Sequence, residues 1–258
     1  MARDDALTDE RHWDENFAGF VPTVVEKVGF YEIYERFLQP APDQTVLEIG
    51  CGGGRHLCWL AKKYQYRPYG IDYSEVGLQK TRETFAVNGL PAPVLYQADL
   101  FKWKTEERFD LVCSFGFVEH FADFAGVIAR HAELVKPGGL LIFGMPHMAH
   151  LNYVFRWLVD RETLRDHNTR IMNLRAIRAA LRPLPFDILH LNYYRTFAFP
   201  PPRPGLTSWQ KAAYVLIYNF GRTIRKLFGR KRPNFLISPK IICVARRRVG
   251  PLARTGAS

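Results

Sequence analysis

Three glycines at alternate positions follow a carboxylate within VLEIGCGGGRHLCWLA, residues 46–61. The apolar residues around Glu48 predict a buried strand, and those after Gly54 predict the start of a helix. Gly50, Gly52 and Gly54 therefore lie in a strand-to-helix turn, where the lack of a Cβ atom lets a ligand approach the main chain. A carboxylate just before the turn would repel a diphosphate, so we expect a cationic or zwitterionic ligand.

Acidic residues also end the next two strand-like runs. Asp72 ends YGID, and Asp99 ends YQAD. In open α/β sheets, ligands bind at the carboxyl ends of the strands, where an acidic residue can accept hydrogen bonds from two ribose hydroxyls. Asp72 could instead cap the helix that begins at Ser74, and the two roles are compatible. The three turns together predict one ligand site at the carboxyl end of a sheet.

The elements that position these residues alternate along the chain. Helical stretches around 55–64, 74–88 and 121–134 separate the first five of seven strand-like runs. This alternation predicts an α/β fold with a doubly wound, seven-stranded, mostly parallel sheet. We expect the last two runs to pair antiparallel, which gives the sheet an antiparallel edge strand. The seven runs are 45–49, 68–71, 94–97, 109–114, 140–144, 186–193 and 240–245.

The domain organisation follows from the same pattern. The expected parts are an N-terminal helical cap (1–40), a core (41–199 and 235–248), a basic amphipathic helical insertion before the last strand (200–234) and a disordered tail (249–258). Trp13, Phe17 and Tyr31 of the cap either wall the ligand site or pack as ordinary helix residues. The N-terminal residues lack the apolar stretch of a signal peptide, so we expect a cytoplasmic protein.

With these motifs in this order, the sequence resembles the class I S-adenosylmethionine-dependent methyltransferases, well over 45–146 and more weakly to Arg246. The resemblance implies that S-adenosyl-L-methionine is the cofactor. It implies that the glycine turn holds the methionine part, with Glu48 supporting the aminoacyl end, and that Asp99 accepts from the adenine amino group. The cofactor-binding residues implied are Glu48, Gly50, Cys51, Gly52, Asp72, Tyr73, Asp99, Leu100, Phe101, Ser114 and Phe115.

Histidines that follow the fourth and fifth strands are the candidate catalytic residues. His120 lies beside Glu119, which could orient the ring, and a neutral imidazole can serve as a base or orient an acceptor. His120 could also be only a helix-start residue that contacts the loop. His147 is a second candidate. The four cysteines are scattered and show no clustered ligand spacing, so we expect free thiols and no metal.

The positive charge is concentrated at the end of the chain. The net charge is +11, yet after Asp187 there is no acidic residue and there are 14 basic ones. Residues 207–232 predict a helix with an apolar stripe opposite basic residues. The stripe is Trp209, Ala213, Leu216, Phe220, Ile224 and Leu227, and the basic residues are Lys211, Arg222, Arg225 and Lys226. Three interpretations stay open: a helix packed on the core or over the acceptor pocket, a contact with an anionic membrane surface, and nucleic-acid binding. The last is the least favoured, because no RNA-binding module is present.

Function is expected to follow the resemblance. We expect methyl transfer to a small-molecule, lipid or glycan acceptor, at a hydroxyl oxygen. The alternatives are an RNA methyltransferase and a non-catalytic methyltransferase-like binding protein. The intact acidic and glycine positions argue against the last of these, and the residues after Pro146 do not identify the acceptor.

Overall fold

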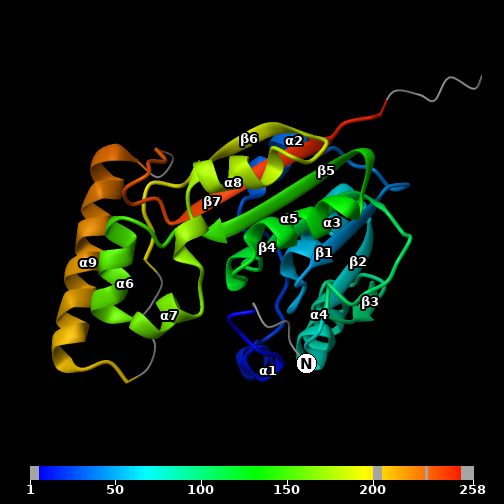
Figure 1. Cartoon of the computed structure of the whole chain (residues 1–258). Helices are drawn as coiled ribbons and strands as arrows, with labels where there is room; N and C mark the ends of the chain where they lie inside the picture. The colour runs from blue at the N-terminus through cyan, green and yellow to red at the C-terminus, as the bar shows by residue number, and fades with distance from the viewer. Residues whose placement is uncertain (1–5, 200–204, 230–231, 251–258) are drawn as a thin grey trace, which may run out of the picture.

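The computed structural model describes residues 6–199, 205–229 and 232–250, and its centre is a single twisted sheet (Figure 1). The seven strands lie in the order β3-β2-β1-β4-β5-β7-β6. All neighbouring pairs among β1 to β5 are parallel, whereas β7 is antiparallel to both β5 and β6. The strands are β1 (Thr45–Ile49), β2 (Arg67–Asp72), β3 (Val94–Gln97), β4 (Phe109–Phe115), β5 (Val135–Pro146), β6 (Phe186–Tyr194) and β7 (Lys240–Arg247).

Helices cover both faces of this sheet. One apolar layer joins residues of α5 (Phe124–Glu133) and α8 (Leu174–Leu181) to the sheet, and the other joins residues of α2 (Tyr31–Phe37) and α3 (Arg55–Tyr64). Neighbouring residues of a strand serve opposite layers: Leu47 packs into the first and Val46 into the second. This alternation is what a central strand buried on both faces requires. The doubly wound α/β fold is confirmed.

The antiparallel pair forms the edge that was predicted for it. β6 is the outermost strand, and β7 lies between it and β5. Strand β5 begins earlier than expected, at Val135, because Lys136 to Gly139 remain within it as an irregularity: Phe109 pairs with Val135, whereas Leu111 pairs with Leu140. Gly138 lies in this irregularity with a φ of 82°, a conformation that glycine adopts without strain.

Shorter elements lie at the carboxyl end of the sheet and beside it (Figure 1). Helix α1 (Glu10–Ala18) and α4 (Glu75–Val87) pack together, and the 3₁₀ turns η1 (Val118–His120) and η2 (Thr169–Ile171) follow β4 and α7 (Arg161–Arg165). Helix α9 (Ser208–Phe228) packs against α6 (Leu151–Val159). A third small apolar cluster between them includes Val159, Phe197, Ile217 and Ile237.

Two sequence predictions stay open. The predicted tail lies outside the described residues from 251 onward, so its disorder remains a prediction. The division of the chain into four parts also remains a prediction. Among the helices that the structure describes, none has both the length and the apolar character needed to cross a membrane.

Candidate functional site

A cavity of about 850 Å³ opens where β1, β2 and β4 end, beneath α1. This volume falls in the range of small-molecule sites. The structure brings nine of the predicted site residues together around it. They are Gly50, Gly52, Asp72, Tyr73, Asp99, Leu100, Phe101, Phe115 and His120.

The glycine turn forms the floor of this cavity and needs its glycines for two reasons. Gly50 has a φ of 68°, which side-chain-bearing residues rarely adopt. A Cβ at Gly50 would lie 2.5 Å from Cδ2 of Phe117, and a Cβ at Gly52 would collide with the ring of Phe17. The lack of side chains therefore lets these two rings lie against the turn, and both glycines also line the cavity.

Three predicted residues lie behind the cavity wall. Glu48 is buried and accepts a 2.7 Å hydrogen bond from the main-chain N–H of Leu57, which ties β1 to α3; burial raises the pKa of Glu48 to about 8. Cys51 is buried, and its Sγ faces Gly70. The Ser114 hydroxyl is hydrogen-bonded to His131. None of the three lines the cavity, so in this structure they support the turn and the strand.

Asp72 lies at the centre of the hydrogen bonds that fix the turn. Its Oδ2 accepts from the Gly52 N–H at 2.9 Å and its Oδ1 from the Ser74 N–H at 3.0 Å. The helix cap itself is Ser74, whose hydroxyl accepts from the Gly77 N–H. Burial raises the pKa of Asp72 to about 6. Because each carboxylate oxygen has more than one lone pair, Asp72 can still accept hydrogen bonds from a diol in the cavity.

The loop after β3 carries the second acidic group. Oδ1 of Asp99 accepts from the Phe101 N–H at 2.9 Å, and its other oxygen lies 3.4 Å from Nζ of Lys102. Arg130 of α5 donates to the carbonyls of Leu100 and Trp103 and so holds the loop. The result is a carboxylate beside apolar side chains, an arrangement that suits a flat ring with an exocyclic donor. No motif in the sequence pointed to Arg130.

The N-terminal segment covers the cavity. Trp13 and Phe17 of α1 line it and stack with 5.9 Å between their ring centroids. The Ser74 hydroxyl donates to Asp14 at 2.5 Å, which fastens α1 to the start of α4. Tyr31, the third aromatic residue considered for this wall, does not line the cavity and instead has Nζ of Lys27 3.6 Å from its ring centroid.

The lining is acidic. It contains five carboxylates and two basic side chains. An excess of one charge sign in a cleft raises the local concentration of ligands of the opposite sign. The cavity therefore favours a cationic ligand, as the sequence predicted. The charged residues are Asp9, Glu10, Asp14, Asp72 and Asp99, with Arg11 and Lys102.

His120 reaches the cavity from η1, directly after β4. Its Nδ1 donates to the main-chain carbonyl of Asp166 at 2.7 Å, so the proton lies on Nδ1 and Nε2 presents a lone pair. Burial lowers the pKa of His120 to about 3. The ring meets the edge of Trp13 at 5.0 Å. His120 is thus a neutral imidazole, well placed to contact a ligand but a weak proton acceptor.

The second candidate histidine lies elsewhere. His147 is buried, donates from Nδ1 to the carbonyl of Ser238 at 2.7 Å, and packs against the ring of Tyr193. It does not line the cavity. The structure therefore does not bring the two predicted catalytic histidines together. The lining also includes Phe117, Phe121, Asp14 and Gln97, which sequence reasoning missed. The aromatic residues after β4 were the one available signal.

Comparison with known proteins agrees with this geometry. Residues 26–191 match a family described as a methyltransferase domain. A trans-aconitate 2-methyltransferase from Acidovorax sp. (strain JS42) is 27% identical over 190 residues, which cover 69% of this chain and 70% of that protein. A ubiquinone biosynthesis O-methyltransferase from Brucella anthropi is 31% identical over 132 residues, which cover 46% of this chain and 52% of that protein.

Solved structures share the fold at low identity. The N-methyltransferase NodS from Bradyrhizobium japonicum, in complex with S-adenosyl-L-homocysteine, superposes with a TM-score of 0.56 at 15% identity over 93% of this chain and 99% of that one. Magnesium protoporphyrin IX methyltransferase from Synechocystis PCC 6803, with bound S-adenosylhomocysteine, gives a TM-score of 0.53 at 16% identity over 92% and 82%.

Proposed function

Because the chain belongs to the class I S-adenosylmethionine-dependent methyltransferases, with S-adenosylmethionine as cofactor, we propose that it methylates a hydroxyl oxygen of a small-molecule acceptor. The observation that carries the proposal is the position of His120. Its neutral ring lines the same cavity as Gly52 and Asp72, and Nε2 is the ring nitrogen that can accept a hydrogen bond. An uncharged acceptor of hydrogen bonds at that wall suits a hydroxyl group.

The residues present fit the cofactor. Asp72 has lone pairs for the ribose hydroxyls, Asp99 has an oxygen for an exocyclic amino group, and the turn at Gly50 and Gly52 exposes main chain. The acidic lining suits the cationic end. When bound, S-adenosylmethionine supplies an electrophilic methyl group on a positively charged sulfur. We assign Tyr73, Leu100, Phe101 and Phe115 to the same pocket, and Glu48, Cys51 and Ser114 to its support.

The protein's own contribution is positioning. In-line transfer needs the acceptor oxygen close to the methyl carbon, and holding both in one site supplies much of the rate increase. We propose that His120 accepts a hydrogen bond from the acceptor hydroxyl and aims its oxygen lone pair. Trp13 and Phe17 of α1 cover the cavity and exclude water. His147 is proposed only as a residue that supports the end of β5, because its Nδ1 is engaged by Ser238.

The relatives support oxygen as the acceptor atom. One is named as an O-methyltransferase and another as acting on trans-aconitate, which is rich in oxygen and contains no nitrogen. The test is incubation of the purified protein with isotopically labelled S-adenosylmethionine and separate pools of organic acids, phenols, lipids, glycans and RNA, with product masses as the readout. An oxygen-methylated small molecule is the expected product. Label found only on nitrogen, sulfur or RNA would refute the proposal.

We further propose that α9 contacts an anionic membrane surface. Ala213 and Ile224 of the predicted stripe pack beside α6, whereas the rest of the stripe is exposed: Trp209 by 54%, Leu216 by 71%, Phe220 by 40% and Leu227 by 69%. None of the described residues of α9 lines the cavity.

The neighbouring helix extends this surface. Leu151, Val154 and Trp157 of α6 are also exposed, and α6 and α9 lie side by side (Figure 1). On α9, Lys211, Arg222 and Lys226 lie on the side opposite the exposed stripe at 100° per residue. Exposed apolar residues with basic residues across the helix fit a helix that lies in an anionic interface. A lipid acceptor presented at that surface would be one use for it.

A further inference from the structure

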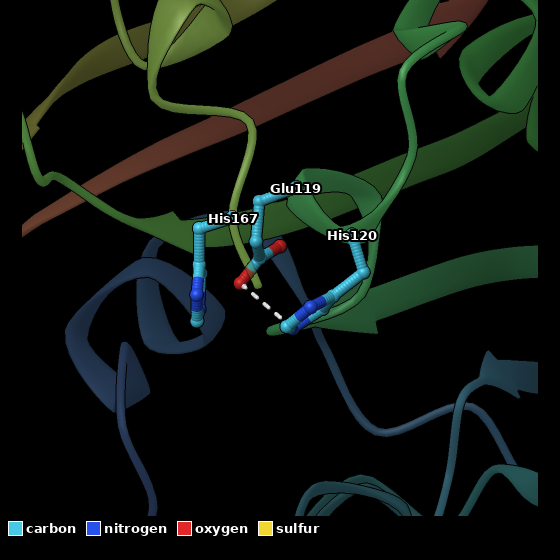
Figure 2. Close-up of side chains that lie close together, drawn as sticks. All are labelled: Glu119, His120 and His167. Atoms are coloured by element: carbon cyan, nitrogen blue, oxygen red, sulfur yellow. Dashed lines mark ion pairs between the residues drawn. The ribbon is translucent and has the colours of Figure 1, made fainter. Parts of the chain in front are cut away.

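A glutamate and two histidines converge beside the cavity. Figure 2 shows Glu119 and His120 of η1 facing His167, which follows α7. One ligand atom from each side chain lies within 4.8 Å of the other two. Three atoms with this spacing share a point within about 2.8 Å of each, so movements of under about 1 Å would reach the ~2.0–2.2 Å bonds of a bound zinc ion.

Both imidazoles are already oriented for ligation. Nδ1 of His120 donates to the carbonyl of Asp166 at 2.7 Å, and Nδ1 of His167 donates to the carbonyl of Thr163 at 2.6 Å. A carbonyl oxygen can only accept, so in each ring the proton lies on Nδ1 and Nε2 presents the lone pair. A main-chain carbonyl bonded to the far nitrogen is the usual way in which proteins orient a metal-binding histidine.

The buried Glu119 side chain is the strongest indication of a bound cation. The Glu119 side chain is 1% exposed, its Oε2 has no hydrogen-bond partner among the described residues, and its Oε1 lies 4.0 Å from Nε2 of His120. A buried carboxylate oxygen that accepts no hydrogen bond is unfavourable. A cation between the carboxylate and the two imidazole lone pairs would remove that penalty.

Main-chain hydrogen bonds hold the two segments in register. The Asn168 N–H donates to the carbonyl of Glu119 at 2.7 Å, and the Asn168 side chain donates to the carbonyl of Phe121 at 3.0 Å. Together with the bond from His120 to Asp166, these contacts fix the loop after α7 against η1. The cluster is therefore built from well-anchored backbone.

We propose that Glu119, His120 and His167 bind one divalent transition-metal cation at the cavity wall. Two imidazole nitrogens and one carboxylate suit Zn²⁺, Co²⁺ or Mn²⁺, and three protein ligands leave a position for a further oxygen ligand. Because the ion would take the lone pair of His120 Nε2, it would replace the imidazole as the group that holds the acceptor oxygen at the same wall of the cavity. This use of the ion rests on the proposed function, whereas binding of the ion does not. The prediction of no metal considered only cysteine spacing and did not weigh this set.

Metal binding can be measured without an acceptor. The purified protein is treated with a chelator, dialysed and titrated with Co²⁺, followed by visible absorption, and then with Zn²⁺, Mn²⁺ and Mg²⁺ by calorimetry. We expect one transition-metal ion per chain, a cobalt spectrum of low coordination number, and much weaker binding of Mg²⁺. Absence of stoichiometric binding by all three transition metals would overturn the proposal.

Variants locate the site. Glu119→Gln keeps the shape and removes the charge, and His167→Gln changes a half-buried side chain; each should weaken binding by about 100-fold or more. His190→Gln on β6 is the matched control and should bind as the wild type does. Affinity for S-adenosylhomocysteine, measured in parallel, checks that each variant is folded. Wild-type metal affinity in a folded His167→Gln protein would place the ion elsewhere and refute this ligand set.

The two proposals can fail separately. One bound ion per chain with no methylated oxygen acceptor would leave the metal site standing and refute the proposed function. Oxygen methylation that is unaffected by chelation, in a protein that binds no transition metal, would do the reverse.

Discussion

The two walls of the cavity are built in different ways. On one wall, Gly50, Asp72 and Asp99 each follow the end of a strand, so a short stretch of sequence places each of them. On the other wall, His120 meets Trp13 from the N-terminal helix and His167 from beyond α7. The first wall depends on local pattern and sheet order. The second depends on how distant segments dock, and this is the wall that we propose selects the acceptor.

The largest effect should come from a substitution in the second wall, which we call the docked wall. His120→Ala should lower turnover by about 10²–10⁴-fold, because the acceptor oxygen loses the group that positions it. Affinity for S-adenosylhomocysteine should change by less than about threefold, since the strand-end residues are untouched. Steady-state kinetics with the identified acceptor, and calorimetry, separate the two. His190→Ala is the control. Equal losses in turnover and cofactor affinity would mean that the two walls do not act separately.

A second substitution tests the first wall, which we call the strand-end wall. Gly52→Val should weaken binding of S-adenosylhomocysteine by about 100-fold, because the new side chain collides with Phe17 and occupies the space above the turn. The matched control is Gly19→Val, whose Cβ meets nothing within 4 Å. Calorimetry gives the affinities, and circular dichroism the folded state. A folded Gly52→Val protein with wild-type affinity would remove the turn from the cofactor site.

The strand-end wall should also carry a pH dependence. Burial raises the pKa of Asp72 to about 6, with Asp14 adding to the rise and the N–H groups of Ser74 and Gly52 opposing it. Only the ionised carboxylate accepts hydrogen bonds from two hydroxyls at once. Affinity for S-adenosylhomocysteine should therefore be constant above about pH 6 and fall by up to about tenfold per unit below it.

Asp72→Asn separates this effect from other titrations. The variant should bind more weakly at neutral pH by about 1–3 kcal/mol, the usual cost of a lost hydrogen bond to a charged group. Its affinity should no longer fall as the pH drops from about 6 to about 5. Calorimetry across that range compares the two proteins. A similar fall in both would assign the titration to another group.

The residues of the strand-end wall were easier to predict from the sequence than those of the docked wall, and the reason is physical. The strand-to-helix turn at Gly50, and Asp72 one strand later, follow from periodicity and glycine chemistry, and sheet order brings strand ends together. Ser114 was expected to bind the cofactor, but its alternation within β4 turns the hydroxyl toward His131. The carboxyl ends of β1 to β4 were predicted to within one residue, but the face that each side chain takes is less predictable.

No comparable sequence pattern predicts which residues meet in the docked wall. His167 follows a short helix, and its approach to His120 depends on the Asn168 hydrogen bonds to η1. Likewise, Asp14 reaches Ser74 only because α1 packs on α4. Such contacts join segments whose separation in the sequence carries no periodic pattern. The fold and the meeting of the strand ends were therefore predictable, whereas the approach of His167 to His120 and the hydrogen bond from Ser74 to Asp14 were not.

The smallest expected effect on the cavity itself comes from changes on the outer surface, at α9. Each basic residue near an anionic bilayer contributes about 1 kcal/mol, so reversal of three charges on α9 should abolish flotation with vesicles that contain phosphatidylserine and leave cofactor affinity unchanged. Lys211, Arg222 and Lys226 are the exposed choices, whereas Arg225 donates to the carbonyl of Phe197 and is left intact.

The control for that experiment reverses three exposed basic residues on the strand-end half of the molecule. They are Arg82, Lys104 and Arg108. Because they have no exposed apolar stripe beside them, their change to Glu should leave most of the flotation intact, and binding of the wild-type protein should weaken as salt is added. Equal losses in both triple variants would show attraction by net charge alone. Wild-type protein that stays off anionic vesicles at low salt would mean that the exposed residues of α6 and α9 meet a different partner.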